Sequence, residues 1–396
     1  MTDTADKGLL TQLVRGGLER SQFNETSEAL YLTSGYVYET AEEAEAAFEG
    51  GISRYVYTRY GNPTVTALQE RMALLEGAEK CLATGTGMAA IFAALACQVG
   101  QGDRIVASRA LFGACHAILT KILPRWGVQV ELIDGRDLDA WEAALAQPCK
   151  IVFLESPSNP TLQLVDIRAV ADLAHKAGAR LVIDNVFASP IHQKPLAFGA
   201  DIICYSATKH IDGQGRVMGG LVLGDASFID DELLPFYRQT GATISPFNAW
   251  VLLKALETLP LRIEAQSKSA AAIATMLAGH DKIASVSYPG HESHPQHELA
   301  KRQMTGFGAI LAFDVKGGKK AAFDLLNKLQ LIDISNNLGD SKTLACHPAS
   351  TTHMNIGADE RALLEISEGH IRLSVGLEDC DDLLADLSQA LNNMGA

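Results

Sequence analysis

The stretch Asp201-Ile-Ile-Cys-Tyr-Ser-Ala-Thr-Lys-His210 decides the fold. Its first five residues form a run typical of a strand, and the polar segment Ser206–His210 follows directly. A glycine-rich loop, Asp212–Gly220, comes next. A strand that runs into such a loop is typical of an α/β sheet, where ligands bind beyond the carboxyl ends of the strands.

Strand and helix patterns alternate on both sides of this stretch. Strands are expected at Lys80–Ala83, Arg104–Ala107, Gln129–Ile133, Ile151–Glu155, Arg180–Asp184, Asp201–Tyr205 and Gly220–Leu223. Several of these runs are rich in Ile, Val and Leu, as in parallel strands buried on both faces. Between them, segments such as Met88–Val99 and Asp166–Ala177 have helical spacing. The alternation predicts an α/β fold with a mostly parallel, seven-stranded sheet.

The two flanks of this region are less regular. We expect an N-terminal segment over residues 1–62, a large domain over 63–258 and a smaller C-terminal α/β domain over 259–396. Helices are expected at Thr40–Phe48, from Pro63 or Thr64 to about Glu76, at Phe247–Leu259 ending at Pro260, at Lys319–Lys328 and at Cys380–Asn392. Two further strands are expected at Gly308–Val315 and Gly369–Val375.

Composition narrows the function classes. A chain of 396 residues, 47% hydrophobic and 20% charged, is typical of a soluble globular protein with two or three domains. A net charge of −14 argues against a nucleic-acid partner. Seven scattered cysteines without a CxxC pair indicate neither a disulfide framework nor a zinc site. The first residues do not resemble a signal peptide, and the longest apolar run, Met88–Cys97, is about half of a membrane span. We therefore expect a cytoplasmic protein without membrane contact.

Lys209 and Asp184 carry the main functional hypothesis. Each follows or ends an expected strand, so an amine and a carboxylate would meet at one edge of the sheet. Pyridoxal 5'-phosphate (PLP) chemistry needs this pair: the lysine forms a Schiff base, and the acid keeps the pyridine nitrogen protonated. Ser206 and Thr208 could donate hydroxyl hydrogen bonds to the phosphate. The alternative is a surface lysine in a helix-capping segment.

The small-residue loop Ala83–Ala90 also suits a phosphate, because it lies between a strand and an Ala-rich helix. It fits the pattern G-x-G-x-x-A, with Asp103 further on, so an NAD-dependent dehydrogenase is a second hypothesis. That hypothesis leaves Lys209 and Asp184 without roles. Tyr57 and Arg59 could clamp a phosphate as well, or could simply lie on a solvated strand edge.

Six motifs recur in the order of one known family. They are Tyr57-x-Arg-x-Gly-Asn-Pro-Thr64, Gly87-Met-Ala-Ala90, Glu155-Ser-Pro-x-Asn-Pro-Thr161, Asp184-Asn185, Ser206-x-Thr-Lys209 and Arg372-Leu-Ser-Val-Gly-Leu-Glu378. Over nearly its whole length the chain resembles the Cys/Met-metabolism PLP enzymes of fold type I. The resemblance implies an enzyme with PLP as its cofactor and a homotetramer built from catalytic dimers.

The resemblance also implies residue roles. Lys209 would be the catalytic lysine, and Asp184 would pair with the pyridine nitrogen. The phosphate would be held by Gly87, Met88, Ser206 and Thr208, together with Tyr57 and Arg59 from the arm of a neighbouring subunit. Asn159 and Arg372 would contact the substrate, and Ser335 would present backbone groups to its carboxylate. No metal is expected, and the histidines of His291–His297 are expected to lie in a solvated loop.

One departure points to a branch of the family. Many members carry Tyr-Gly-Gly-Thr where this chain has Phe112-Gly-Ala-Cys115. Phe112 keeps a stacking face but has no proton to give. An enzyme that expels a stable carboxylate needs that proton less than one that expels sulfur. The segment Ile334–Asp340, with Asn337 in place of a serine, agrees with the sulfhydrylase branch.

The expected reaction is therefore that of an O-succinylhomoserine sulfhydrylase, a transferase of methionine biosynthesis that uses O-succinylhomoserine and sulfide. Cystathionine γ-synthase, O-acetylhomoserine sulfhydrylase and methionine γ-lyase are the alternatives within the family. Outside it stand the dehydrogenase and a non-catalytic binding protein.

Overall fold

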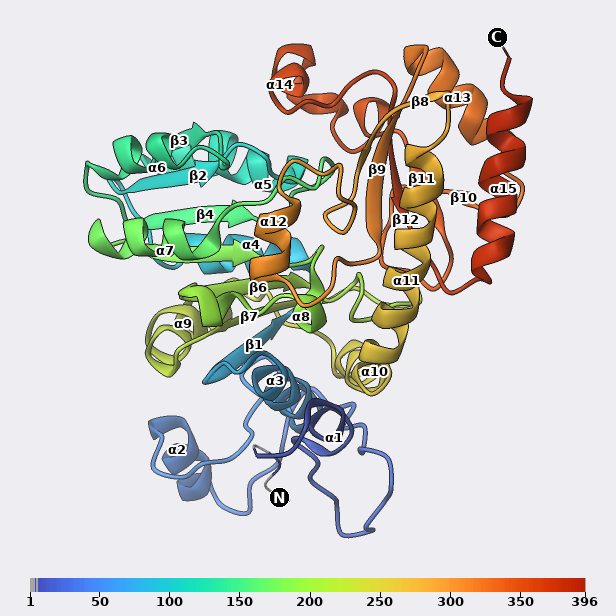
Figure 1. Cartoon of the computed structure of the whole chain (residues 1–396). Coiled ribbons are helices and arrows are strands. Elements are labelled where there is room, and N and C mark those ends of the chain that lie inside the picture. Colours follow the sequence, from blue (N-terminus) through green and yellow to red (C-terminus); the bar gives the residue numbers. More distant parts are fainter. Residues whose placement is uncertain (1–3, 5, 396) are drawn as a thin grey trace.

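The computed structural model describes residue 4 and residues 6–395, which form two β-sheets covered by helices (Figure 1). Within these residues the larger sheet has seven strands in the order β1-β7-β6-β5-β4-β2-β3. They are β1 (Lys80–Thr84), β2 (Arg104–Ser108), β3 (Gln129–Ile133), β4 (Ile151–Glu155), β5 (Arg180–Asp184), β6 (Ile202–Ser206) and β7 (Gly220–Gly224). Neighbours from β6 to β3 pair in parallel, whereas β7 is antiparallel to β1 and β6. The expected mostly parallel sheet is confirmed, with every strand within one residue of its predicted ends.

Alternating side chains of the larger sheet enter two different cores, as the pleat of a strand requires. In β4, Phe153 packs in the core beneath α4 (Gly87–Ala96) and α5 (Gly113–Ala117), while Val152 and Leu154 pack in the opposite core. The helices on that opposite face are α6 (Leu138–Leu145) and α7 (Ile167–Lys176), and, further along the sheet, α3 (Pro63–Glu76) and α10 (Pro246–Leu256). Burial on both faces explains the near-continuous apolar runs of the sequence.

The smaller sheet has the strand order β10-β11-β12-β9-β8 and lies beside the larger one in Figure 1. Its strands are β8 (Ile283–Ser287), β9 (Ile310–Val315), β10 (Asp333–Ile334), β11 (Leu344–Cys346) and β12 (His370–Ser374). It packs against α11 (Leu259–Ala278), α13 (Gly318–Lys328) and α15 (Cys380–Asn393). Four further α-helices, each of seven residues or fewer, follow α7 along the chain: α8 (Ser189–His192), α9 (Leu234–Thr240), α12 (His297–Gln303) and α14 (Ala358–Leu363).

One expected helix end is wrong. The sequence predicts a helix over Phe247–Leu259 that stops at Pro260, but α10 already ends at Leu256 and α11 begins at Leu259. Pro260 therefore lies in the first turn of a 20-residue helix, where its missing N–H leaves no hydrogen bond unmade.

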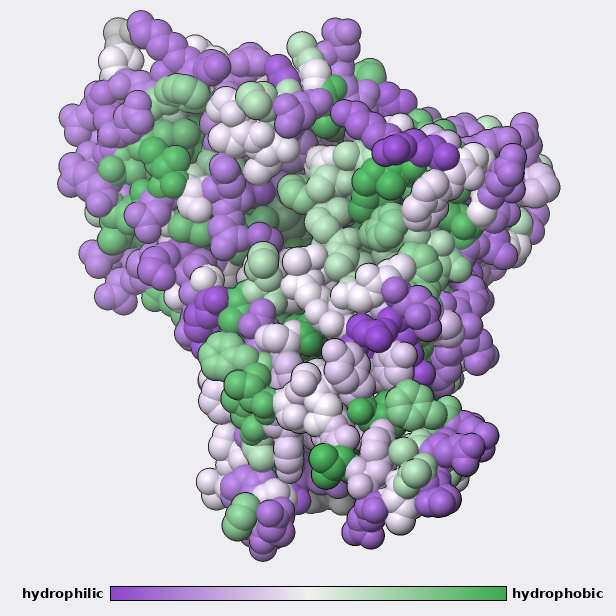
Figure 2. Space-filling model, turned by 180° about the vertical axis from the view of Figure 1, so that it is seen from behind, coloured by the Kyte–Doolittle hydropathy of each residue, from purple (hydrophilic) through white to green (hydrophobic). Residues whose placement is uncertain are grey.

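The N-terminal segment carries α1 (Leu9–Arg15) and α2 (Ala41–Glu49) and lies at the bottom of Figure 1, next to α3 and β1. Several of its large apolar side chains are exposed, and Figure 2 shows apolar residues among polar ones on this part of the surface. They include Phe23, Leu32, Val37 and Phe48. Among the described residues, every helix is too short or too polar to cross a bilayer.

Candidate active site

A cavity of about 330 Å³ lies where the carboxyl ends of β4, β5 and β6 face the smaller sheet. Nine residues that the sequence singles out line it: Gly87, Met88, Phe112, Asn159, Asp184, Ser206, Thr208, Lys209 and Arg372. Thr86, Glu155, Asn336 and Leu338 are among its other lining residues. The cavity therefore joins residues that are up to 286 positions apart, from Thr86 to Arg372.

Lys209 enters this cavity three residues after β6 ends. Its Nζ donates a hydrogen bond to Oδ1 of Asn337 at 2.5 Å. Burial, and then the positive charge of Arg372, lower the pKa of the lysine to about 8. About a tenth of Lys209 is therefore a neutral, nucleophilic amine at pH 7, far more than for a lysine with its ordinary pKa.

Asp184 ends β5 directly opposite Glu155, which ends β4. Its Oδ1 accepts a hydrogen bond from the backbone N–H of Val186 at 3.1 Å. Burial raises the pKa of Asp184 to about 7. A cation beside this carboxyl would stabilise its charged form and lower that pKa again. Asp184 is therefore suited to a protonated ring nitrogen.

The start of α4 forms a cradle for a phosphate. Thr86 caps the helix by accepting from the N–H of Ala89, and the first residue of the helix is Gly87. A Cβ at Gly87 would lie 2.5 Å from Cβ of Ser206, so only glycine fits. Free N–H groups at a helix N-terminus attract anions. The Thr208 hydroxyl is already bonded to the backbone of Gly219, at 3.2 Å as donor and 3.1 Å as acceptor.

Arg372 and Asn159 form the other wall. Arg372 is 2% exposed, and its guanidinium donates to Oδ1 of Asn159 at 3.0 Å. It also donates to the carbonyl oxygens of Asn336 and Asn337, at 2.9 and 3.1 Å. These bonds link β12 to the loop that carries the acceptor of Lys209.

Three of the expected site residues do not line the cavity. Ser335 instead supports the loop: its Oγ accepts from the N–H of Asn337 at 3.3 Å, and its N–H donates to Ala345. Tyr57 is 43% exposed, and the Arg59 guanidinium stacks 4.7 Å from the ring centroid of Tyr60. Within one described chain, neither residue of this pair reaches the cavity.

Glu155 and Asn337 are functional candidates that the sequence reasoning did not assign. Glu155 ends the apolar run Ile151–Glu155, just as Asp184 ends Arg180–Asp184. The sequence therefore places an acid at the end of both strands. The sequence marks Asn337 as a departure from a serine, but its contact with Lys209 depends on the loop conformation.

The family of Cys/Met metabolism PLP-dependent enzymes matches residues 10–392. The chain belongs to this family. The dehydrogenase and the non-catalytic alternatives are therefore set aside.

Individual relatives agree over nearly the whole chain. An O-succinylhomoserine sulfhydrylase of Mycobacterium tuberculosis is 54% identical, and one of Pseudomonas aeruginosa is 48% identical. Each alignment covers 96% of this chain and 94% of the relative. A solved structure from Campylobacter jejuni, assigned as an O-acetylhomoserine (thiol)-lyase, superposes with a TM-score of 0.93 at 31% identity. That superposition covers 98% of this chain and all of the other, which carries a pyridoxyl group on a lysine.

The cavity fits PLP, the cofactor of the family. Its lysine has a lowered pKa, its buried carboxyl suits a ring nitrogen, and Gly87 brings the N-terminus of α4 against Ser206, too close for any side chain at position 87. These three features correspond to the aldehyde, the ring nitrogen and the phosphate of the cofactor.

Proposed function

We propose that this protein is an O-succinylhomoserine sulfhydrylase, which replaces succinate at Cγ of O-succinylhomoserine by sulfide and releases homocysteine. The observation that carries the proposal is the 54% and 48% identity to two enzymes of that name. Phe112 on the cavity wall supports it, because a phenyl ring has no proton for a sulfur leaving group, while succinate leaves as a stable anion. The product would serve methionine biosynthesis.

PLP, when bound, supplies an aldehyde for Lys209 and a ring that withdraws electrons from Cα of the substrate. In the proposed arrangement Gly87, Met88, Ser206 and Thr208 hold the phosphate at the start of α4. Phe112 would lie against the ring, and Asp184 would supply the negative charge for the ring nitrogen.

Lys209 would then work as the proton carrier. Its amine would take the proton from Cα and pass it to the cofactor, and would then take a second proton from Cβ as succinate leaves. After sulfide has added, it would return protons to both carbons. Two features of the cavity support this role: burial lowers the pKa of the amine, and Asn337 offers it a neutral acceptor at 2.5 Å. A neutral acceptor holds the amine without stabilising its charged form as a carboxylate would.

Arg372 would bind the α-carboxylate of the substrate through its guanidinium, with Asn159 beside it. Both line the cavity and are hydrogen-bonded to each other, so the carboxylate would meet a preformed pair. Ser335 would contribute by holding the loop of Asn336 and Asn337 against Arg372.

Tyr57 and Arg59 would complete the phosphate site of a neighbouring subunit. Their distance from the cavity of their own chain and the exposed apolar side chains of residues 1–62 support this arrangement. The proposal therefore includes a homotetramer of catalytic dimers in the cytoplasm, with 63–258 as the cofactor domain and 259–396 as the C-terminal domain.

The proposal is tested by incubating pure protein with O-succinylhomoserine or O-acetylhomoserine, each with sulfide or cysteine. We expect homocysteine and succinate to form fastest from the succinyl ester and sulfide, and the K209A variant to form neither. Faster cystathionine formation would identify a cystathionine γ-synthase, and preference for the acetyl ester an O-acetylhomoserine sulfhydrylase. Release of 2-oxobutyrate and a thiol from methionine would identify a lyase.

A further inference from the structure

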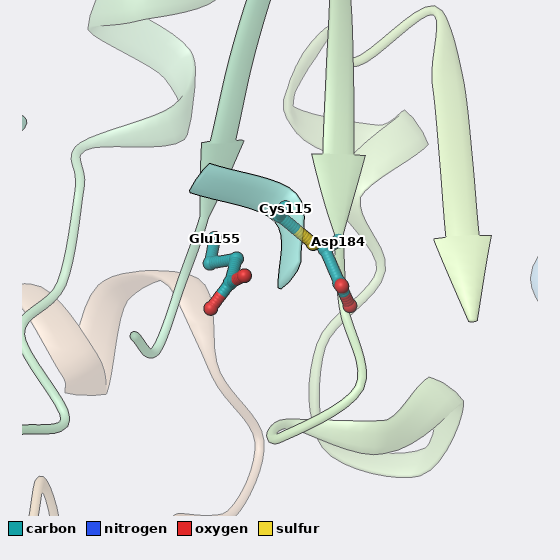
Figure 3. A group of neighbouring side chains, drawn as sticks. All are labelled: Cys115, Glu155 and Asp184. Atoms are coloured by element: carbon teal, nitrogen blue, oxygen red, sulfur yellow. The ribbon is translucent and has the colours of Figure 1, made fainter. Parts of the chain in front are cut away.

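Glu155 lies at the end of β4, and Asp184 lies opposite it at the end of β5. Figure 3 shows both side chains extending past their strands, with Cys115 of α5 between them. Sγ of Cys115, one carboxyl oxygen of Glu155 and one carboxyl oxygen of Asp184 all lie within 4.8 Å of one another. Glu155 is 4% exposed and lines the cavity. It therefore lies next to Asp184, the proposed partner of the ring nitrogen, although no role has yet been assigned to it.

The carboxyl group of Glu155 connects two walls of the cavity. Its Oε1 accepts from the backbone N–H of Phe112 at 2.7 Å, and its Oε2 faces the backbone N–H of Asn159 at 3.4 Å. Phe112 begins the turn into α5, and Asn159 contacts Arg372. The side chain of Glu155 thus holds the backbone of Phe112, which is proposed to lie against the cofactor ring. It also contacts the backbone of Asn159, which is proposed to bind the substrate.

We propose that Glu155 is a positioning residue that works in its uncharged form, holding Phe112 and Asn159 in place beside Asp184. The proposal rests on the proposed function, because it takes the roles of Phe112, Asn159 and Asp184 from there. Glu155 itself touches the walls of the site and not the reacting atoms of the substrate.

The uncharged form follows from the surroundings. Two buried carboxyl groups this close do not ionise together. Burial and the charge of Asp184 raise the pKa of Glu155 well above its ordinary value. Burial also keeps the neighbouring Cys115 a neutral thiol, since its pKa is raised. A protonated ring nitrogen beside Asp184 would favour the charged form of that carboxyl, so the single negative charge of the pair falls on Asp184 and the proton stays on Glu155.

Glutamine is the informative replacement for Glu155. In E155Q the amide oxygen still accepts from the N–H of Phe112. Only the long 3.4 Å contact with the N–H of Asn159 is lost, because an amide nitrogen donates hydrogen bonds and does not accept them. We expect the apparent Kd for PLP to stay within about twofold and the induced circular dichroism of bound PLP to keep its shape. In E155L the N–H of Phe112 loses its buried acceptor, which should weaken PLP binding about tenfold or more and change the dichroism.

Asp386→Asn is the matched control. Asp386 is also a buried carboxyl that accepts backbone N–H groups, from Gln330, Leu331 and Ile332, but it lies on α15 away from the cavity. D386N should leave PLP binding unchanged even where it lowers the melting temperature.

Two outcomes would overturn the proposal. If E155Q bound PLP as poorly as E155L, the charge of Glu155 would be needed, and if E155L behaved like the wild type, no positioning would occur. Should E155L not fold, E155D replaces it with the same expectation, because its shorter side chain withdraws from Phe112. All readouts are taken without substrate, so a failed homocysteine assay would refute the proposed reaction and leave this test unaffected.

Discussion

At the scale of the residue, the chemistry depends on how the protein lowers the basicity of Lys209. Burial accounts for most of the change in pKa, and the positive charge of Arg372 adds to it. The same arginine contacts the loop of Asn337, which accepts a hydrogen bond from the lysine. The group proposed to bind the substrate carboxylate thus also tunes the amine that moves protons.

A pH dependence follows from this pKa. Only the neutral amine attacks the PLP aldehyde, so uptake of PLP by the apoprotein should accelerate as pH rises, with a midpoint of about 8. Removing the charge in R372L takes away one cause of the lowered pKa and should shift the midpoint upward. Stopped-flow absorbance across pH measures both.

Arg302→Gln is the control for that experiment, because Arg302 is an exposed cation on α12. R302Q should keep the wild-type midpoint. An unchanged midpoint in R372L would show that Arg372 does not influence the amine.

At the scale of the element, the ends of strands and the start of one helix hold the functional groups. The sequence predicts the seven strands of the larger sheet well, since burial on both faces leaves unbroken apolar runs. It therefore locates Lys209 and Asp184 through strand ends alone. It places Glu155 at a strand end in the same way, but the role of Glu155 depends on the pairing of β4 with β5, which no single run reveals. It also ends α10 too late, because a proline inside a helical pattern equally marks a stop or a start.

The start of α4 gives a prediction at this scale. In G87A the new Cβ meets Ser206 at 2.5 Å, so the helix start must shift away from β6. We expect a loss of about 1–3 kcal/mol in the free energy of unfolding and a clearly weaker affinity for PLP. Denaturant titration of the apoprotein and PLP titration measure the two effects.

Gly100→Ala offers a comparison, because a Cβ at Gly100 meets no atom within 4 Å. G100A should bind PLP like the wild type. Equal affinity in G87A would contradict a phosphate cradle at this helix.

At the scale of the whole molecule, the described chain brings together nine of the expected site residues but leaves Tyr57 and Arg59 outside. A sequence motif identifies residues such as these two, but it does not tell whether they act in the site of their own subunit or in that of a neighbour. Only the fold shows that this pair lies apart from the cavity of its own chain, with Arg59 directed to Tyr60 and the carbonyl of Arg238.

Mixing two inactive variants tests the shared site. If Arg59 acts in the site of a neighbour, R59A and K209A refolded together should regain activity, approaching about a quarter of the wild-type sites on random pairing into dimers. Activity assays of the mixture and of each variant alone measure this. Recovery no greater than that of the separate variants would show that Arg59 serves its own chain.

PLP is expected to be bound covalently to Lys209, beside Asp184. The most direct measurement is mass spectrometry of holoprotein that has been reduced with borohydride and digested. We expect a phosphopyridoxyl group on the peptide that contains Lys209 and no such group in K209A. A group found on another lysine, or on none, would contradict it.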